Sequence, residues 1–338
     1  MPHSHPPLSP PPAPRRRFPT WLIPLLGYSV SVACLVWVYR GFDWKDELQR
    51  LAQIEWGWVT LAVVSDIAVY VCQGVRWTTL LRPLTSISMW KTTQAVYIGL
   101  FANEVLPFRS GEVIRCYLQR RWTGLPLSVV ISSAVIERIL DGLWLFIFFW
   151  LASLYVELPA GLEWASRVLL AVVAAAGALL AFAVLRNHHA SAAASSSRWK
   201  SWLTPLIDGV HVMGRSATFP AAVVLSFLYL GLQVLPLYFL TQGYGLNLSF
   251  WAAGVVLVVL RLGTVLPQAP GNVGSFQALA ILGLGLFDVP RAEATGFATL
   301  AFLVVTMPLW LGGFVALLLT RMRLDDIHRD AHDSMSQV

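Results

Sequence analysis

The stretch from Asn103 to Arg115 places groups that can bind an anion inside a strongly apolar sequence. Arg109 and Arg115 carry guanidinium groups, which make forked contacts to phosphate. Glu112 lies three residues before Arg115, so the two share one face of a helix. Its carboxylate would limit the positive charge of the site. The stretch therefore predicts a site for a phosphate-like group.

The same stretch also contains a break. Pro107 lacks an amide hydrogen and clashes with the preceding turn, so a helix should end there, and Gly111 relaxes the chain for a reversal. A helix restarting after Pro107 would add backbone donors and partial positive charge. A broken, charged helix at membrane depth persists only inside protein or beside a wet cavity. The alternative is a juxtamembrane loop with solvated charges.

A second group of charges lies in the apolar segment 126–157. Glu137, Arg138 and Asp141 can point towards one sector of a helix. They form either a self-neutralising ion pair that fixes helix packing or the lining of a polar path. In segment 57–81 we expect Asp66 to face the bundle interior, and Arg76 to extend to the membrane interface.

A second break follows residues 250–266, which are apolar except for Arg261. It contains prolines and glycines that end one helix before another begins. The residues of this predicted break are Pro267, Pro270, Gly271 and Gly274. Asn272 and Gln277 add polar side chains beside it. With Asn103 and the first stretch, Arg261, Asn272 and Gln277 complete the predicted binding site.

The composition sets the class of protein. The chain of 338 residues is 57% hydrophobic and 12% charged, with a mean hydropathy of +0.64, whereas soluble proteins carry about 25% charged residues. This indicates an all-α polytopic membrane protein. The net charge of +6 is read as a topology signal, not as nucleic-acid binding. The 3 cysteines and 7 histidines are not placed for a disulfide framework or a metal site, so no metal or cofactor is expected.

The apolar segments predict about six full spans and two re-entrant hairpins of broken helix. The spans are 20–39, 57–81, 126–157, 164–186, 219–242 and 292–320, and the hairpins are 92–119 and 250–288. Basic residues place a disordered tail (1–19), a linker (187–217) and a second tail (321–338) in the cytoplasm, together with both termini.

The order of these elements predicts an inverted-topology repeat. Residues 57–157 and 219–320 each read as span, hairpin and span, and each hairpin has a Leu-Pro break followed by glycine. The first unit starts outside and the second inside. In inverted repeats, broken helices meet near the midplane and build a transport site. Two ordinary short spans in a different topology are the alternative.

Three motifs in this chain resemble those of a known family. The residues Asn103, Pro107, Arg109, Gly111, Glu112 and Arg115 resemble the N-x-x-x-P-x-R-x-G-E-x-x-R signature of the lysylphosphatidylglycerol synthase transmembrane region, a flippase-like membrane family. Glu137 to Asp141 resembles its E-R-x-x-D motif, and Pro270 to Gly274 its P-G-G-x-G motif. The likeness covers most of residues 20–320 and implies translocation or presentation of an anionic phospholipid, a hopanoid-type lipid or a glycolipid.

The chain departs from the family's pattern at three positions. Gln277 replaces a usual glutamate, the arginine expected near Ala301 is missing, and Arg261 is extra. Arg261 would restore the missing cation from another helix. These departures bear on which substrate charge the site would prefer.

Four functions fit these observations. A lipid transporter without enzyme activity would place the head group between Arg109, Glu112 and Arg115 on one hairpin and Arg261 and Asn272 on the other. A lipid head-group transferase would need the soluble catalytic domain of full-length synthases, which the sequence does not show after its last span. An ion-coupled transporter of small solutes and an accessory subunit for a separate lipid-modifying enzyme are the others. We expect membrane lipids as partners and a bacterial cytoplasmic membrane as the location; the sequence predicts no oligomeric state.

Overall fold

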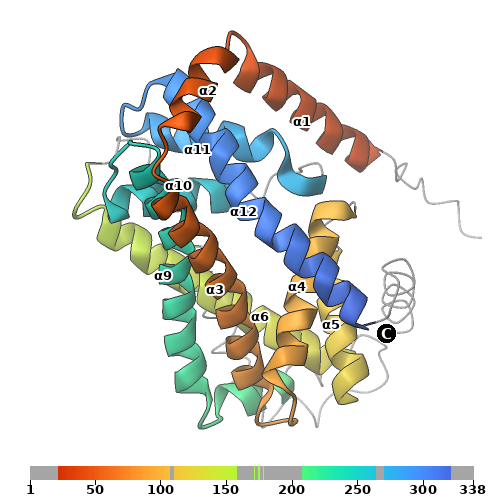
Figure 1. Ribbon diagram of the computed structural model, residues 1–338. Coiled ribbons are helices and arrows are strands. Elements are labelled where there is room, and N and C mark those ends of the chain that lie inside the picture. Colours follow the sequence, from red (N-terminus) through yellow and green to blue (C-terminus); the bar gives the residue numbers. More distant parts are fainter. Residues whose placement is uncertain are drawn as a thin grey trace, which may run out of the picture.

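The computed structural model describes residues 22–106, 110–157, 208–263 and 270–320, with isolated positions between 171 and 178. In these ranges every regular element is a helix (Figure 1), which agrees with the predicted all-α membrane protein. Several predicted features lie outside the described residues. They are Pro107, Arg109, Pro267, both tails, nearly all of span 164–186 and most of linker 187–217.

The first unit contains four helices: α3 (Trp56–Leu81), α4 (Met89–Val105), α5 (Gly111–Thr123) and α6 (Leu127–Ala152). The predicted break is observed, because α4 ends at Val105 and Leu106 is extended at φ −93° and ψ 145°. A residue before proline is driven out of the helical region by the proline ring. Helix α5 packs antiparallel to α4, with Gly111 beside Gly99 and Gln119 bonded to Thr92.

The second unit repeats this order with α9 (Phe219–Gly243), α10 (Phe250–Gly263), α11 (Ser275–Gly285) and α12 (Arg291–Thr320). A single 3₁₀ turn, η2 (Pro270–Asn272), precedes α11. Gly271 and Gly274 have φ values of +76° and +83°, which side chains disfavour. The second predicted break therefore has a backbone suited to glycine.

The contacts between helices are equivalent in the two units. Helix α3 packs along α9, and these central helices run side by side through the bundle (Figure 1). The other contacts given among these eight helices come in pairs that exchange when α3, α4, α5 and α6 are replaced by α9, α10, α11 and α12. Examples are α4 with α12 and α10 with α6, α4 with α5 and α10 with α11, and α5 with α6 and α11 with α12.

Two helices precede the first unit. Helix α1 (Leu22–Tyr39) packs against α11, and α2 (Trp44–Ala52) follows after a bend of 78°. Asp43 caps α2 by accepting a hydrogen bond from the amide of Lys45 at 2.8 Å. On the buried side of α2, the Tyr244 hydroxyl donates to Glu47 at 2.8 Å, which anchors α2 to the end of α9.

Within the described ranges three helices, α3, α9 and α12, are long and apolar enough to cross a membrane, and the bent pair α1–α2 makes a fourth candidate. Helix α6 equals α3 in length, at 26 residues, but carries three ionisable side chains. The described residues support a polytopic membrane protein, and they do not confirm the predicted count of six spans.

The hydrophobic core contains two large clusters, each centred on one pair of short helices. One cluster surrounds the second hairpin, with Leu257, Ile281 and Phe297 among its members. The other surrounds the first hairpin, with Trp77 and Ile114. Between them lies a smaller cluster of Val69, Tyr70, Tyr229 and Leu309, and these four residues also line a cavity. The cavity that these four residues line also contains polar side chains.

Candidate functional site

Six charged side chains from α3, α5 and α6 form a closed ring of alternating sign. Each arginine contacts two carboxylates, and each carboxylate contacts two arginines. In order around the ring they are Arg76, Glu137, Arg115, Glu112, Arg138 and Asp141, which returns to Arg76. Three positive and three negative groups leave the ring formally neutral.

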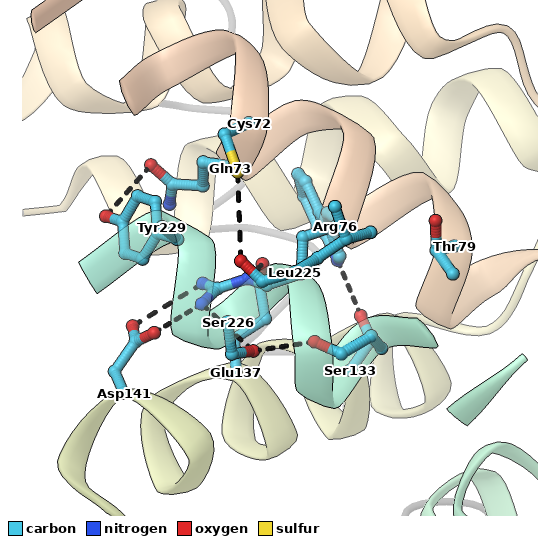
Figure 2. A network of polar contacts seen from close by, with 12 residues as sticks. Cys72, Gln73, Arg76, Thr79, Ser133, Glu137, Asp141, Leu225, Ser226 and Tyr229 are labelled. Carbon is cyan, nitrogen blue, oxygen red and sulfur yellow. Dashed lines mark hydrogen bonds and ion pairs between the residues drawn. The ribbon is translucent and has the colours of Figure 1, made fainter. Parts of the chain in front are cut away.

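One half of the ring is fully buried. Arg76 Nε donates to Glu137 Oε1 at 3.1 Å, and Arg115 Nη1 donates to Glu137 Oε2 at 2.8 Å. Arg76 also pairs with Asp141 (Figure 2). The Arg76 and Glu137 side chains have no exposed surface, and that of Arg115 is 2% exposed. Buried charges of this kind are tolerated when their partners satisfy them, as here.

Aromatic rings and hydroxyl groups support the buried arginines. The guanidinium of Arg76 lies 4.4 Å from the centre of the Tyr229 ring, and that of Arg115 lies 4.5 Å from the Trp77 ring. The Trp77 indole donates to Ser133 Oγ at 2.7 Å. A cation over an aromatic face is attracted by the ring quadrupole. These contacts fix both guanidinium groups in place.

The other half of the ring faces open space. The side chains of Arg138 and Glu112 are 47% and 42% exposed. Arg138 lies 3.7 Å from both Glu112 and Asp141, beyond ordinary hydrogen-bond distance. Glu112 is held more tightly on its other side, at 2.7 Å from Arg115. Arg138 is therefore the ring arginine with the loosest contacts.

These positions change two interpretations of the sequence. Arg76 does not extend to the membrane interface, because α6 and α9 pack over it and it pairs inside the protein. The charges of α6 also do not neutralise one another as a single pair. Glu137 pairs with arginines of α3 and α5, and Arg138 contacts Asp141 only at 3.7 Å.

A cavity of about 250 Å³ lies beside the ring. Both units contribute to it, because its wall includes residues of α3 to α6, of α9 to α12 and of η2. Its polar lining includes most of the predicted site residues that the structure describes. They are Asp66, Asn103, Glu112, Arg138, Arg261 and Asn272. In the described part of the chain, no group of three or more His, Cys, Asp or Glu residues is arranged to hold a metal ion.

The end of α4 contacts η2 beside this cavity. The starts of α5 and α11 are each held by a side-chain amide oxygen. Asn103 Oδ1 accepts from the Gly111 amide at 2.8 Å, and Gln277 Oε1 accepts from the Gly274 amide at 2.8 Å. Gln277 is 3% exposed and does not line the cavity. A glutamate there could accept the same bond, so this departure from the family's pattern preserves the geometry.

Gly111 has a different role from the expected one. It is the first residue of α5 and does not have a positive φ value. A Cβ atom at this position would lie 1.7 Å from the carbonyl oxygen of Gly99. Glycine is therefore required because the two hairpin arms approach closely, and not because the chain reverses at that residue.

The remaining predicted residues lie either on the lining of the cavity or behind it. Arg261 is exposed to the cavity and donates to Gln233 of α9. Asp66 lines the cavity but is only 4% exposed. Arg115 is absent from the lining and lies behind Glu112. Sequence reasoning assigned no role to several polar lining residues, although their polarity within apolar helices was a usable signal: Tyr70, Gln73, Glu104, Tyr229 and Gln233.

Two four-helix units with matching helix contacts surround a cavity that both line with charged residues, which defines a polytopic helical membrane protein with a polar cavity inside its helix bundle. The chain belongs to the family described as the lysylphosphatidylglycerol synthase transmembrane region, which matches residues 25–313. The resemblance seen in the three motifs is thus confirmed.

Curated relatives carry only a general description. A UPF0104 membrane protein of Methanocaldococcus jannaschii is 21% identical over 290 residues, covering 79% of this chain and 86% of the relative. A UPF0104 membrane protein of Methanothermobacter thermautotrophicus is 23% identical over 277 residues, covering 74% and 80%. One of Pyrococcus horikoshii is 26% identical over 157 residues, covering 45% and 44%. These relatives are archaeal, so the expected bacterial membrane and orientation of the termini gain no support.

Proposed function

We propose that this protein is a lipid transporter that binds an anionic head group in the central cavity and moves it across the bilayer. The observation that carries the proposal is the pair of arginines on the cavity wall. Arg138 comes from the first unit and Arg261 from the second, and both side chains are exposed to the cavity. A phosphate between them would contact both units at once.

The long contacts of Arg138 would let it exchange its carboxylate partners for a phosphate. Its distances of 3.7 Å to Glu112 and Asp141 allow a phosphate to form shorter, charge-assisted bonds. Glu112 would remain paired with Arg115 during the exchange. Arg115 is thus a positioning residue in this proposal, while Arg109 remains a predicted head-group ligand outside the described residues.

The size of the cavity favours a head group over a whole lipid. Pockets for drug-sized ligands measure about 300–1,000 Å³, and this cavity measures about 250 Å³. The acyl chains would stay in the bilayer, and the head group would enter from the side. No large soluble domain is needed for this task, so we propose transport and not head-group transfer.

The equivalent helix contacts support an inverted repeat with two re-entrant hairpins. In such transporters, one unit rocks against the other around a fixed site and exposes that site to each side in turn. In this proposal both breaks lie beside the site, and the contact of α4 with η2 supports that arrangement. Movement of either hairpin would therefore open the cavity towards one face of the membrane.

Binding can be tested with purified protein in detergent. Short-chain phosphatidylglycerol should raise the unfolding temperature, whereas the matching diacylglycerol, which lacks the phosphate, should not. Glycerol phosphate is the control for a site that binds small solutes. Stabilisation by glycerol phosphate and not by the lipid would favour the small-solute transporter, and no response to the lipid would contradict a head-group site.

A further inference from the structure

Asp66 differs from the other buried carboxylates that the structure describes. Those residues are Glu47, Asp66 and Glu137. Glu47 accepts hydrogen bonds from Tyr244 on both oxygens, and Glu137 pairs with two arginines. Asp66 is 4% exposed, and its Oδ2 atom is buried without a hydrogen-bond partner in the described structure. The ion pairs of the ring do not include Asp66.

The position of Asp66 connects it to the proposed head-group site. Asp66 and Arg261 line the same cavity from opposite units, so the positive charge of Arg261 favours the charged form of Asp66. A buried carboxylate with one oxygen left without a hydrogen bond is costly in its charged form, and a nearby cation lowers that cost. The charge state of Asp66 therefore depends on whether Arg261 is available to balance it.

We propose that Asp66 is the proton-binding group of the transporter and takes up a proton when an anionic head group binds Arg261. This inference rests on the proposed function and supplies its energy source. The phosphate neutralises Arg261, and Asp66 then takes a proton from water on Oδ2. When the head group leaves, Arg261 again balances the carboxylate, and the proton returns to water. Lipid and proton would thus bind together, as in a symporter.

Among the acids that line the cavity, Asp66 is the one best placed to bind a proton. Two tyrosines act on Asp66: Tyr70 of its own helix α3, whose hydroxyl bonds to the carboxylate, and Tyr97 of α4. Tyr229 of α9 lies next to Tyr70 and not next to Asp66. The other charged residues of the cavity wall are Glu104, Glu112 and Arg138, and α12 contributes no titratable group to that wall. Glu112 is held at 2.7 Å by Arg115, which keeps it ionised and less suited to binding a proton.

The coupling is reciprocal by thermodynamic linkage. If lipid binding promotes protonation of Asp66, a lower pH must tighten lipid binding. The parent should therefore bind short-chain phosphatidylglycerol more tightly as the pH falls. Asp66→Asn mimics the protonated acid in shape and charge, so it should bind tightly with an affinity that no longer depends on pH.

Proton uptake tests the inference directly. A pH-indicator dye in weakly buffered detergent solution would report the proton taken up when short-chain phosphatidylglycerol is added. The parent and Asp46→Asn, a change at an exposed position on α2, should both take up protons. Asp66→Asn should bind the lipid without uptake. Should that variant not fold, Asp66→Thr, which also cannot bind a proton, takes its place.

The outcomes separate this inference from the proposed function. A parent that binds the lipid without taking up protons would overturn the role of Asp66 and leave the head-group site intact. Undiminished uptake by a folded Asp66→Asn would do the same. A parent that binds no phosphatidylglycerol would instead contradict the proposed function itself.

Discussion

Arg76 on α3 and Glu137 on α6 pair at 3.1 Å with neither side chain exposed. Glu137 also binds Arg115 of α5, so one carboxylate connects three helices of the first unit. This arrangement explains how a helix with three ionisable residues packs inside an apolar bundle. The buried half of the ring holds the helices together, while Arg138 and Glu112 face the cavity. Structural and binding roles are therefore divided within one network.

The first prediction concerns the two glutamates of the ring. Glu137→Gln should reduce the free energy of unfolding by about 3–5 kcal/mol, because it removes the buried carboxylate that two buried arginines share. Glu112→Gln should cost only about 0–1 kcal/mol, since its side chain is 42% exposed. Unfolding of both variants in the same detergent would measure the difference. Equal losses of unfolding free energy in the two variants would mean that both glutamates are equally exposed to water, which would contradict a buried half of the ring.

The second prediction concerns the close approach of the first hairpin's arms. Gly111→Ala should destabilise the protein strongly, because the new Cβ atom would overlap the Gly99 carbonyl at 1.7 Å. Gly231→Ala in α9 is a matched control with no atom within 4 Å of its added Cβ. That change should be neutral or stabilise α9 by up to about 1 kcal/mol. Similar melting temperatures for the two variants would mean that the arms are further apart.

The third prediction concerns topology. Single cysteines at Met89 and Thr123, in a chain without its native cysteines, should label from the same side of the membrane, because both ends of a re-entrant hairpin return to one face. Cysteines at Ser249 and Val289 should label from the opposite side. Labelling of Met89 and Thr123 from opposite sides would make the first hairpin a crossing and remove the inverted repeat.

The sequence predicted the elements of the two units well because their signals are local. Leu106 precedes a proline and leaves the helix, and Gly271 and Gly274 adopt the backbone that favours glycine. The order of a long helix, two shorter helices and another long helix in each unit therefore followed from proline, glycine and apolar runs. The predicted number of six membrane spans was not confirmed. Helix α6, for example, has the length of a span but carries three charges.

The pairing of charges could not be read from the sequence. Adjacent residues on a helix point about 100° apart, so Glu137 faces α3 and α5 while Arg138 faces the cavity. Helical periodicity gives the face of a residue but not the neighbouring helix. Arg76 was misread for the same reason, because its place near the end of α3 did not reveal that α6 and α9 cover it.

Movement of labelled phosphatidylglycerol between the leaflets of proteoliposomes tests the central claim most directly. The parent should move the lipid, and Arg138→Gln and Arg261→Gln should fold but lose most of this activity. Arg121→Gln, at an exposed position near the end of α5, should transport normally. Full transport by folded Arg138→Gln and Arg261→Gln, or a parent that moves a soluble ion but no lipid, would contradict the account.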